Sequence, residues 1–309
     1  MYRFAPLFVI VAAVLWAVDG IVLRPELFSL PVTLVVFTES VIVAVLLTPI
    51  LIKNFSVLKS LHSKDWLAFV GVALLGGAIG TMAITKALFF VNFVNLSIVI
   101  LIQKLQPVFA LILAWLFLKE KLSKEFFLWA VFAIIGAYFM TFGLRLPVIQ
   151  PGDKTVLAAL YALLAAASFG SSTVLSKRAL RNVSFELGTY LRFAISAVIM
   201  LVMILGSGSI QNISDITSRQ FMIFLLIAFT TGGTAIFLYY YGLKQITASV
   251  ATICELAFPL AAVALEYFLR GNILRPVQWI GALVLFLSIL QVTKIPAKTS
   301  KIIPDQTSL

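Results

Sequence analysis

The sequence predicts an all-α membrane protein with ten transmembrane helices arranged as two inverted five-helix repeats. The first observation is the composition, because 62% of the 309 residues are hydrophobic, 11% are charged and the mean hydropathy is +1.11. Soluble domains do not have this composition. The second observation is that the apolar residues form ten segments, most near the ~20 residues that a helix needs to cross the hydrocarbon core. The third is that the two halves of the chain match under a fixed shift in numbering.

Short connections separate the ten apolar segments, so no inserted soluble domain is expected. The segments cover residues 4–23, 32–52, 66–90, 96–118, 126–143, 155–176, 187–205, 220–241, 248–268 and 276–294. We expect a first repeat at 1–143, a linker loop at 144–154, a second repeat at 155–294 and a cytoplasmic tail at 295–309. The first segment lacks a convincing small-residue cleavage site, so we interpret it as an uncleaved helix and not as a signal peptide.

Lysine and arginine are concentrated in the loops on one side of the predicted bundle. That side includes Lys53, Lys121, Arg178 and Lys294, whereas the opposite loops hold fewer basic residues, among them Arg24. The more basic side should be cytoplasmic, which places both termini inside and the protein in the inner membrane. The net charge of +11 therefore does not indicate nucleic-acid binding, because the basic residues lie in short loops and not on one soluble face.

The residues needed for common enzymatic or metal chemistry are missing. The chain has one histidine, His62, and one cysteine, Cys254, so the sequence offers no His/Cys metal cluster. It has no nucleotide-phosphate loop, and no Ser/His/Asp set can be assembled at membrane depth. We therefore expect no enzyme activity, no metal and no cofactor, and a driving force that comes from an ion or solute gradient.

The internal repeat is clearest at glycine and proline. A shift of 152 places Gly80 on Gly232 and Pro107 on Pro259. Each half has an odd number of spans, so the second half enters the membrane upside down relative to the first. Inverted repeats of this kind place a substrate site near the midplane between the halves, and rocking of the halves gives alternating access. The glycines would allow close helix packing or serve as a hinge or backbone lining of the site.

The predicted fourth span has a polar centre interrupted by proline. Lys104 lies one turn before Pro107 and two turns after Ser97, with Gln103 and Gln106 beside them. A lysine at this depth costs about 2.5–3.5 kcal/mol, so it should face protein or water and not lipid. Pro107 also frees a backbone carbonyl. This pattern indicates the lining of a transport path; the alternative is a buried lysine neutralised by a nearby carboxylate.

The ninth span carries the matching acidic residue. Glu255 shares a helical face with Thr252 and is the repeat equivalent of Gln103. We interpret Glu255 and Thr252 as substrate-binding residues; the alternative is that Glu255 is a buried partner of Arg192. Arg192 itself is expected to be structural or gating, because guanidinium groups readily form bidentate buried pairs.

Two carboxylates of the first half are the candidates for coupling to protons. Asp19 lies near the outer end of the first span, and Glu39 lies deeper, in the second. Acidic groups inside a membrane commonly belong to proton or ion pathways. The alternatives are a structural ion pair of Glu39 with Lys86 or Lys104, and a pair of Asp19 with Arg24 or Lys86. Lys86, near the outer end of the third span, is a gating residue or a side chain that snorkels to the interface.

Aromatic and hydroxyl side chains complete the predicted site. Trp16 in the first span and Tyr190 in the seventh could line the path. Ser172 belongs to a hydroxyl stripe with Thr173 in the sixth span, which either binds a polar ligand or bonds its own backbone. Tyr239, in contrast, is expected in an aromatic belt at the inner membrane interface.

These features together resemble the drug/metabolite transporter superfamily, in particular its ten-span members with two EamA-type domains. The resemblance rests on the two repeats and on Trp16 within LWAVDG, and it covers nearly the whole chain. Other parts that carry it are the Lys-Leu-Gln-Pro and Glu-Leu-Ala-Phe-Pro segments that end at Pro107 and Pro259, the segment LFLKEKLS with Glu120 as the acidic residue, and QWIGALVLF at residues 278–286. The chain departs from the family pattern at Glu39, where an arginine is expected, and at Asn272, where an acidic residue is expected.

The resemblance implies an inner-membrane carrier, often an exporter of amino acids or related metabolites that is linked to the proton gradient. We predict a secondary transporter of small zwitterionic metabolites, with Lys104 and Glu255 binding opposite charges. The first alternative is a carrier that exchanges or takes up an anionic metabolite, bound by Lys86, Lys104 and Arg192. The second is a non-transporting scaffold or lipid-handling protein. The expected partners are a small-molecule substrate, the lipid bilayer and protons, and the chain would act as a monomer or homodimer.

Overall fold

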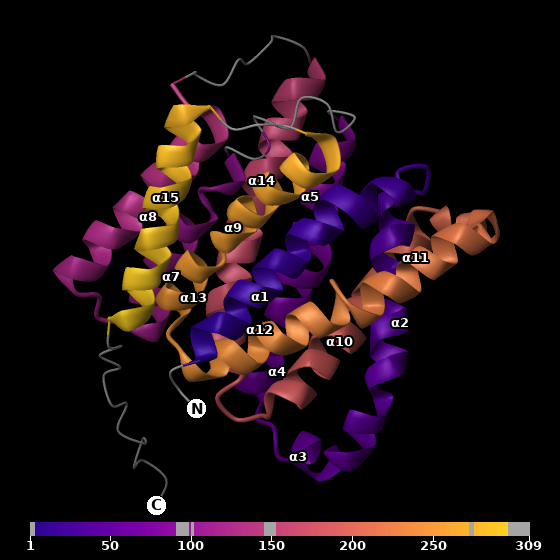
Figure 1. Ribbon diagram of the computed structural model, residues 1–309. Coiled ribbons are helices and arrows are strands. Elements are labelled where there is room, and N and C mark those ends of the chain that lie inside the picture. Colours follow the sequence, from indigo (N-terminus) through magenta and orange to yellow (C-terminus); the bar gives the residue numbers. More distant parts are fainter. Residues whose placement is uncertain (1–3, 91–98, 100–101, 145–152, 272–274, 296–309) are drawn as a thin grey trace, which may run out of the picture.

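The structure is a computed structural model that describes residues 4–90, 99, 102–144, 153–271 and 275–295, and these residues form a helical bundle (Figure 1). The first half contains α1 (Ala5–Val18), α2 (Val32–Lys53), α3 (Phe55–Lys59), α4 (Ser63–Val72), α5 (Gly80–Phe90), α7 (Gln106–Leu118) and α8 (Lys124–Phe142). The second half contains α9 (Asp153–Ala179), α10 (Phe185–Gly206), α11 (Ser218–Phe229), α12 (Gly233–Gln245), α13 (Ala248–Cys254), α14 (Ala257–Arg270) and α15 (Pro276–Lys294).

The predicted fold class is confirmed by the lengths and composition of these helices. Among the described residues, nine helical stretches are long and apolar enough to cross a membrane, and α7 is a shorter apolar helix. α7 forms the second part of the predicted fourth span, so the ten predicted spans are accounted for. Some spans consist of two consecutive helices. Examples are α4 with α5 over Ser63–Phe90 and α11 with α12 over Ser218–Gln245.

Polar side chains at the span ends explain where several helices begin. Ser123, Ser184 and Thr247 each accept a hydrogen bond from the backbone N–H three residues later, at the starts of α8, α10 and α13. Such caps satisfy donors that the first turn of a helix leaves free. Thr217 and Gln220 form a reciprocal capping box at the start of α11. The residues between these capped ends are apolar and form helix without a further capping residue.

Helices of one half pack mainly on helices of the other. α5 and α7 of the first half pack on α9, and α12 and α14 of the second half pack in the same way on α1. The pairs α2–α10 and α8–α15 join equivalent spans of the two halves, and α8 and α15 lie side by side in Figure 1. Exchanging the halves therefore maps the packing onto itself, as two inverted repeats require.

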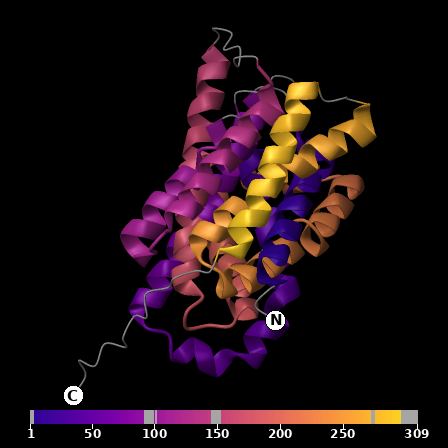
Figure 2. The same ribbon diagram turned by 60° about the vertical axis from the view of Figure 1, so that its left-hand side comes forward.

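Glycines allow the closest of these contacts. A Cβ on Gly136 of α8 would lie 2.7 Å from the backbone nitrogen of Leu285 in α15, and Gly281 of α15 packs equally closely on the backbone of α8. Small residues let membrane helices approach in this way. The start of α1 and the end of α15 lie at the same end of the bundle (Figures 1 and 2).

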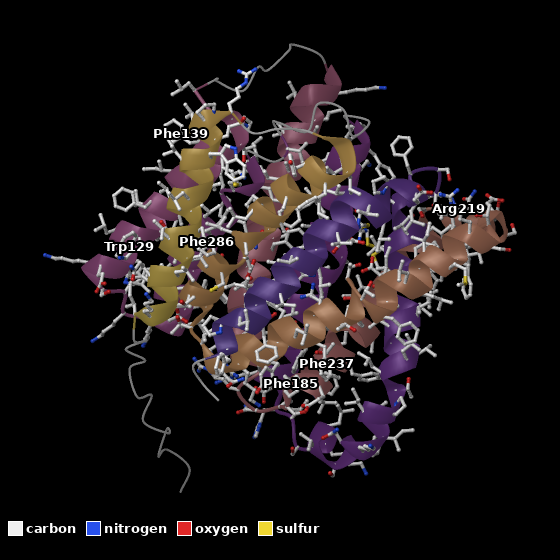
Figure 3. All side chains as sticks on the ribbon, viewed as in Figure 1. Trp129, Phe139, Phe185, Arg219, Phe237 and Phe286 are labelled. Atoms are coloured by element: carbon white, nitrogen blue, oxygen red, sulfur yellow. The ribbon has the colours of Figure 1, made fainter. Side chains whose placement is uncertain are left out.

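Large apolar side chains cover the outside of the bundle, as expected for a lipid-facing surface. Phe286 on α15 is 51% exposed and lies on the outer face of its helix (Figure 3). The interior contains many alanine, serine and threonine side chains together with larger apolar ones. Several polar residues are therefore buried, away from the lipid-facing surface.

The spans are interrupted at equivalent places in the two repeats. In the third span a π-helical segment, Ala73–Ile79, separates α4 from α5, and in the eighth span the turn at Thr230–Gly232 separates α11 from α12. In the fourth span a turn at Lys104–Leu105 precedes α7, and in the ninth a turn at Glu255–Leu256 separates α13 from α14. Discontinuous helices of this kind expose backbone and side-chain polar groups in the centre of transporters.

Candidate functional site

The interrupted fourth and ninth spans meet in the interior. Gln106, the first residue of α7, donates a hydrogen bond from Nε2 to Oε2 of Glu255, which ends α13, at 2.5 Å. Gly170 of α9 allows this placement, because a Cβ there would lie 2.8 Å from the carbonyl oxygen of Gln106. The contact therefore joins one helix break from each half of the chain.

Two further side chains bind the other oxygen of the same carboxylate. Tyr239 on α12 donates its hydroxyl to Oε1 of Glu255 at 2.7 Å, and the Thr173 hydroxyl on α9 lies at 3.4 Å from the same atom. The Tyr239 and Thr173 hydroxyls are also 3.0 Å apart. We call Gln106, Thr173, Tyr239 and Glu255 the central cluster. Within the part of the chain that the structure describes, Glu255 forms hydrogen bonds with uncharged groups and makes no ion pair.

An aromatic surface adjoins the central cluster. The rings of Trp16 on α1 and Tyr239 have centroids 5.3 Å apart and are tilted by 55°. Trp16 is only partly buried. An indole and a phenol beside hydrogen-bonding groups form a surface on which a planar ring can stack while its edge is bound by polar groups.

Arg192 lies near the acidic residues of both the first and the second half. Its Nη1 donates to the Tyr240 hydroxyl at 3.4 Å, and its guanidinium lies 5.9 Å from the centre of the Tyr240 ring. It is also near enough to attract both Glu39 and Glu255 electrostatically, although it forms no ion pair with either among the described residues. The alternative in which Glu255 is a buried partner of Arg192 therefore holds only as an attraction at a distance, since the two form no ion pair among the described residues.

The glycine-containing π-helical segment of the third span brings two polar residues close to the backbone. A Cβ on Gly76 would lie 3.2 Å from Nη1 of Arg192 and would collide with the hydroxyl of Ser172. Ser172 is 3% exposed, and its hydroxyl has no hydrogen-bond partner among the described residues. The predicted hydroxyl stripe is thus divided, because Ser171 bonds the carbonyl of Ala167 and Thr173 belongs to the central cluster.

A second group of charges, the ionic cluster, consists of Asp19, Arg24 and Glu39. Arg24 donates from Nε to Asp19 at 2.7 Å, and its Nη2 lies 2.6 Å from Asp19 and 3.2 Å from Glu39. The Thr231 hydroxyl, at the break of the eighth span, donates to the second oxygen of Asp19 at 3.3 Å. The predicted pairing of Asp19 with Arg24 is confirmed, whereas the predicted pairing of Glu39 with Lys86 or Lys104 is wrong.

Arg24 joins this cluster because the first span continues past α1. A π-helical segment, Asp19–Leu23, and a 3₁₀ turn, Arg24–Leu27, follow α1 and turn the arginine inward, where it is 7% exposed. Its placement among the basic residues of the outer loops is therefore wrong. Lys86, in contrast, is exposed, with its Nζ over the rings of Tyr161 and Phe90 at 5.1 and 6.0 Å.

The predicted site residue Lys104 is buried without a partner. It is 7% exposed, and its Nζ has no hydrogen-bond partner among the residues that the structure describes. The alternative in which a nearby carboxylate neutralises Lys104 is therefore wrong for this part of the chain. The Thr252 hydroxyl is likewise buried and unpartnered. Unpartnered buried donors of this kind are costly and often mark a binding site for water or a ligand.

The other predicted positions are distributed as follows. Gln103 and Tyr190 are partly buried, and Pro107 and Pro259 are buried near the starts of α7 and α14. A Cβ on Gly80 would lie 3.0 Å from the Phe169 ring, and one on Gly232 would lie 3.0 Å from Oε1 of Glu39. Close packing therefore accounts for both glycines. Ser97 lies outside the described residues.

Sequence reasoning missed the role of Tyr239. It was assigned to an interfacial aromatic belt, but it is 3% exposed and bonds the Glu255 carboxylate. Tyr239 and Glu255 are sixteen residues apart and lie on two different helices. The sequence does not show how these helices pack, so the contact could not be predicted. Gln106 was noted only as a neighbour of Lys104, although its amide makes the direct link to Glu255.

Polar contacts also tie the two halves together at the end of the bundle where α4, α9 and α13 have their loops. Asp65 accepts from Arg178 at 3.1 Å and from Asn182 at 3.0 Å. Glu120, 5% exposed, accepts from the backbone N–H groups of Ala248 and Ser249 at 2.8 and 3.0 Å, at the start of α13. The acidic residue that the family resemblance indicates thus caps a helix of the other half, and carboxylates are favoured at that position.

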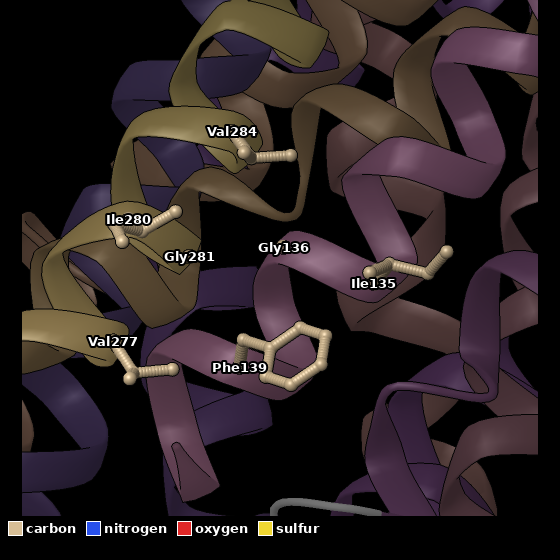
Figure 4. Close-up of a pocket in the computed structure, with 7 residues that line it drawn as sticks. All are labelled: Ile135, Gly136, Phe139, Val277, Ile280, Gly281 and Val284. Carbon is tan, nitrogen blue, oxygen red and sulfur yellow. The ribbon is translucent and has the colours of Figure 1, made fainter. Parts of the chain in front are cut away.

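One further depression lies between α8 and α15 (Figure 4). It has a volume of about 180 Å³ and is lined by residues without polar side chains, namely Ile135, Gly136, Phe139, Val277, Ile280, Gly281 and Val284. It offers no hydrogen-bonding side chain to a polar solute. Among the described residues, no group of three or more His, Cys, Asp or Glu side chains could hold a metal ion.

Comparison with known proteins decides the family. Residues 3–142 and 156–294 each match the EamA-like transporter family. The chain belongs to that family. A solved crystal structure shares the fold, with a TM-score of 0.71 at 17% identity over 94% of this chain and 96% of that one. EamA-like membership and the names of the relatives below indicate a multi-pass membrane transporter and not an enzyme.

Three relatives extend this finding. The riboflavin transporter ImpX of Fusobacterium nucleatum subsp. nucleatum is 44% identical over 293 residues, which is 94% of this chain and 97% of that protein. The uncharacterized transporter YwfM of Bacillus subtilis is 29% identical over 94% of both chains. The uncharacterized transporter sll1164 of Synechocystis is 26% identical, over 74% of this chain and 66% of that protein.

Proposed function

We propose that this EamA-like protein is a secondary transporter of riboflavin or a closely related flavin, which it moves by alternating access. The observation that carries the proposal is the 44% identity to ImpX, a riboflavin transporter, along nearly the full length of both chains. The sequence-level prediction named amino acids and related zwitterions as cargo, and the name of this relative favours a flavin instead.

The chemistry of the central cluster supports an aromatic, uncharged substrate. Riboflavin combines a flat ring system, whose edge carries carbonyl and N–H groups, with a chain of hydroxyls. Trp16 and Tyr239 provide an aromatic surface for the ring, and Gln106 and Glu255 provide hydrogen-bonding groups at one side of it. Stacking of a ring with polar groups at its rim is a common arrangement in ligand sites.

Unpartnered donors offer further bonds to the hydroxyl chain and the ring carbonyls. Lys104, Ser172 and Thr252 each have a buried polar atom without a partner among the described residues. A bound polyol or carbonyl would satisfy these atoms and recover the cost of burying them. Ser172 and Thr252 are small hydroxyls, which suit an uncharged partner better than a charged one.

The helix breaks and the contacts between halves support alternating access. Gln106 with Glu255, and Thr231 with Asp19, are contacts between the first and second half at two different levels of the bundle. The pairs at Asp65 and Glu120 join the halves at the end of the bundle where α1 starts and α15 ends. Rocking of the halves would break one set of contacts while the other set holds, so the centre opens to one side at a time.

A zwitterionic amino acid is the second candidate, and the specific observation in its favour is the state of two charges. Lys104 is buried and Glu255 is partly buried, and neither has an ion-pair partner among the described residues. A carboxylate and an ammonium on one solute could neutralise both. Proton coupling through Asp19 or Glu39, cytoplasmic termini and the choice between monomer and homodimer remain proposals.

The test is counterflow in proteoliposomes that contain the purified full-length protein. Vesicles loaded with unlabelled solute are diluted into labelled riboflavin, and the same assay is run with labelled amino acids and phosphorylated sugars. We expect transient accumulation of labelled riboflavin that depends on the riboflavin inside. Accumulation of amino acids alone would replace riboflavin by the second candidate, and exchange of anions alone would contradict both.

A pH gradient across the same vesicles tests the coupling. If protons are co-substrates, riboflavin should accumulate above its equilibrium level when the gradient is applied without internal riboflavin. Movement that only equalises the two concentrations would show that the protein is a facilitator, and the coupling proposal for Asp19 and Glu39 would then be wrong.

A further inference from the structure

The hydrogen bonds of Glu255 leave room for one more donor. A carboxylate has about four acceptor positions. Tyr239 and Thr173 use Oε1, and Gln106 uses Oε2. Among the described residues no second donor reaches Oε2. Glu255 and Gln106 are partly exposed, although both lie where the halves meet, whereas Tyr239 and Thr173 are buried. The free acceptor position is therefore on Oε2, the oxygen bonded by the partly exposed Gln106.

The groups around this carboxylate form an ordered set of donors and acceptors. Gln106 presents an amide N–H on one side of Glu255, and Tyr239 presents a hydroxyl on the other. In order, Gln106 is a donor, Glu255 is an acceptor and Tyr239 is a donor. The complementary ligand edge reads acceptor, donor, acceptor, which is the pattern of a cyclic imide, where a ring N–H lies between two carbonyl groups. The ring system of riboflavin has one such edge.

We infer that Glu255 reads the imide N–H of the transported ring, while Gln106 and Tyr239 donate to the two carbonyls beside it. This assignment rests on the proposed function and names the feature of the substrate that the site selects. It requires little rearrangement, because Gln106 and Tyr239 each turn from the carboxylate to a carbonyl, while the ring N–H bonds Oε2 and Thr173 keeps its bond to Oε1. No buried polar group loses its partner in that exchange.

The aromatic contacts agree with this orientation. Trp16 lies against the Tyr239 ring, so a flat ligand whose edge meets Glu255 has the indole of Trp16 within reach of its face. Asp19 and Glu39 are less suited to the same task, because the guanidinium of Arg24 already bonds both carboxylates. An acceptor shared with a buried arginine can take a further N–H only if that ion pair weakens.

A change in the ligand combined with a change in the protein tests the inference. The ligand pair is riboflavin and riboflavin methylated at the imide nitrogen, which lacks the N–H. The protein pair is wild type and Glu255→Gln, with Glu125→Gln as the matched control, because Glu125 is an exposed carboxylate on α8. Dissociation constants are measured by flavin fluorescence on purified full-length protein, so that the readout does not depend on transport.

We expect wild type and Glu125→Gln to bind the methylated flavin roughly ten- to hundredfold more weakly than riboflavin. In Glu255→Gln this ratio should fall toward one, because the charged acceptor that distinguishes the two ligands is gone. Glu255→Asp, which keeps a carboxylate, should bind riboflavin more weakly yet retain discrimination. A purely structural role of Glu255 would weaken both ligands alike and leave the ratio unchanged.

The outcomes separate this inference from the proposed function. If wild type moves and binds riboflavin but binds the methylated flavin equally well, the imide assignment is wrong and the transport proposal stands. If the discrimination persists undiminished in Glu255→Gln, another residue reads the N–H and the assignment is again wrong. If wild type neither binds nor moves riboflavin, the proposed function itself fails.

Discussion

The central cluster and the ionic cluster contain the same kind of acidic side chain in different surroundings. Glu255 is bonded by an amide and two hydroxyls, all of them uncharged. Asp19 and Glu39 instead share the guanidinium of Arg24. Amides and hydroxyls can both donate and accept hydrogen bonds, whereas arginine can only donate. A site with such partners can adapt to a ligand, and a buried ion pair holds a fixed geometry.

The difference between these clusters also indicates their tasks. The central cluster joins α7 of the first half to α9, α12 and α13 of the second, next to two helix breaks. The ionic cluster lies mainly within the first half and reaches the second through Thr231. We therefore assign recognition to the central cluster, and closure of one side of the path, with any proton coupling, to the ionic cluster.

Removal of Arg24 should have the largest effect on stability. Arg24→Leu leaves Asp19 and Glu39 buried near each other without their shared cation, which should destabilise the fold by about 3–5 kcal/mol. Thermal unfolding in detergent measures this change. Arg219→Ala is the control, since the exposed pair of Arg219 with Glu26 should contribute about 1 kcal/mol or less. Equal losses in both variants would contradict the assigned role of the ionic cluster.

A methyl group on Gly232 should perturb the ionic cluster from the other half. Its Cβ would lie 3.0 Å from Oε1 of Glu39 and 3.1 Å from the Ile227 carbonyl oxygen. We expect Gly232→Ala to cost about 1–3 kcal/mol, because overpacked contacts must shift. Gly206→Ala, at a position with nothing within 4 Å, should change stability by less than about 0.5 kcal/mol. Unfolding midpoints of the two variants provide the measurement, and a neutral Gly232→Ala would show that the break is looser than its contacts indicate.

Removal of one hydroxyl should weaken recognition with a smaller effect on the fold. Tyr239→Phe keeps the ring against Trp16 but removes a donor to Glu255. A loss of about 1–1.5 kcal/mol corresponds to roughly fivefold to tenfold weaker riboflavin binding. Tyr267→Phe, on the exposed face of α14, is the matched control and should bind like wild type. Unchanged affinity in Tyr239→Phe would place the flavin away from the central cluster.

Neutralising Glu39 should affect proton coupling more specifically than the other substitutions. Glu39→Gln keeps the shape of the side chain and leaves Arg24 paired with Asp19, so stability should change less than in Arg24→Leu, which leaves two carboxylates without a cation. Counterflow of riboflavin should persist, while the response to a pH gradient should disappear. The two vesicle assays, run on the same preparation, measure both. A retained response would exclude Glu39 as the proton carrier and leave Asp19 to be tested.

Several site residues could be predicted because their chemistry conflicts with a membrane. Lys104, Glu255, Asp19 and Glu39 stand out as ionisable groups within apolar segments, and all four are central to the structure described above. Gln106 and Tyr239 could not be predicted in the same way. An amide or phenol near a span end is common, and its partner Glu255 is separated from Gln106 by 149 positions in the chain.

The sequence by itself determined the class of fold, the number of spans and the position of the breaks. These depend on the local pattern of apolar residues and on Gly80, Gly232, Pro107 and Pro259, which act on their own turns of helix. Only the tertiary structure decided which charges meet. Arg24 reaches Asp19 and Glu39 because the first span continues as a π-helical segment, and Tyr239 reaches Glu255 because α12 packs beside α13. The packing of the helices against one another sets the direction in which each side chain points. This direction cannot be predicted from the sequence of a single helix.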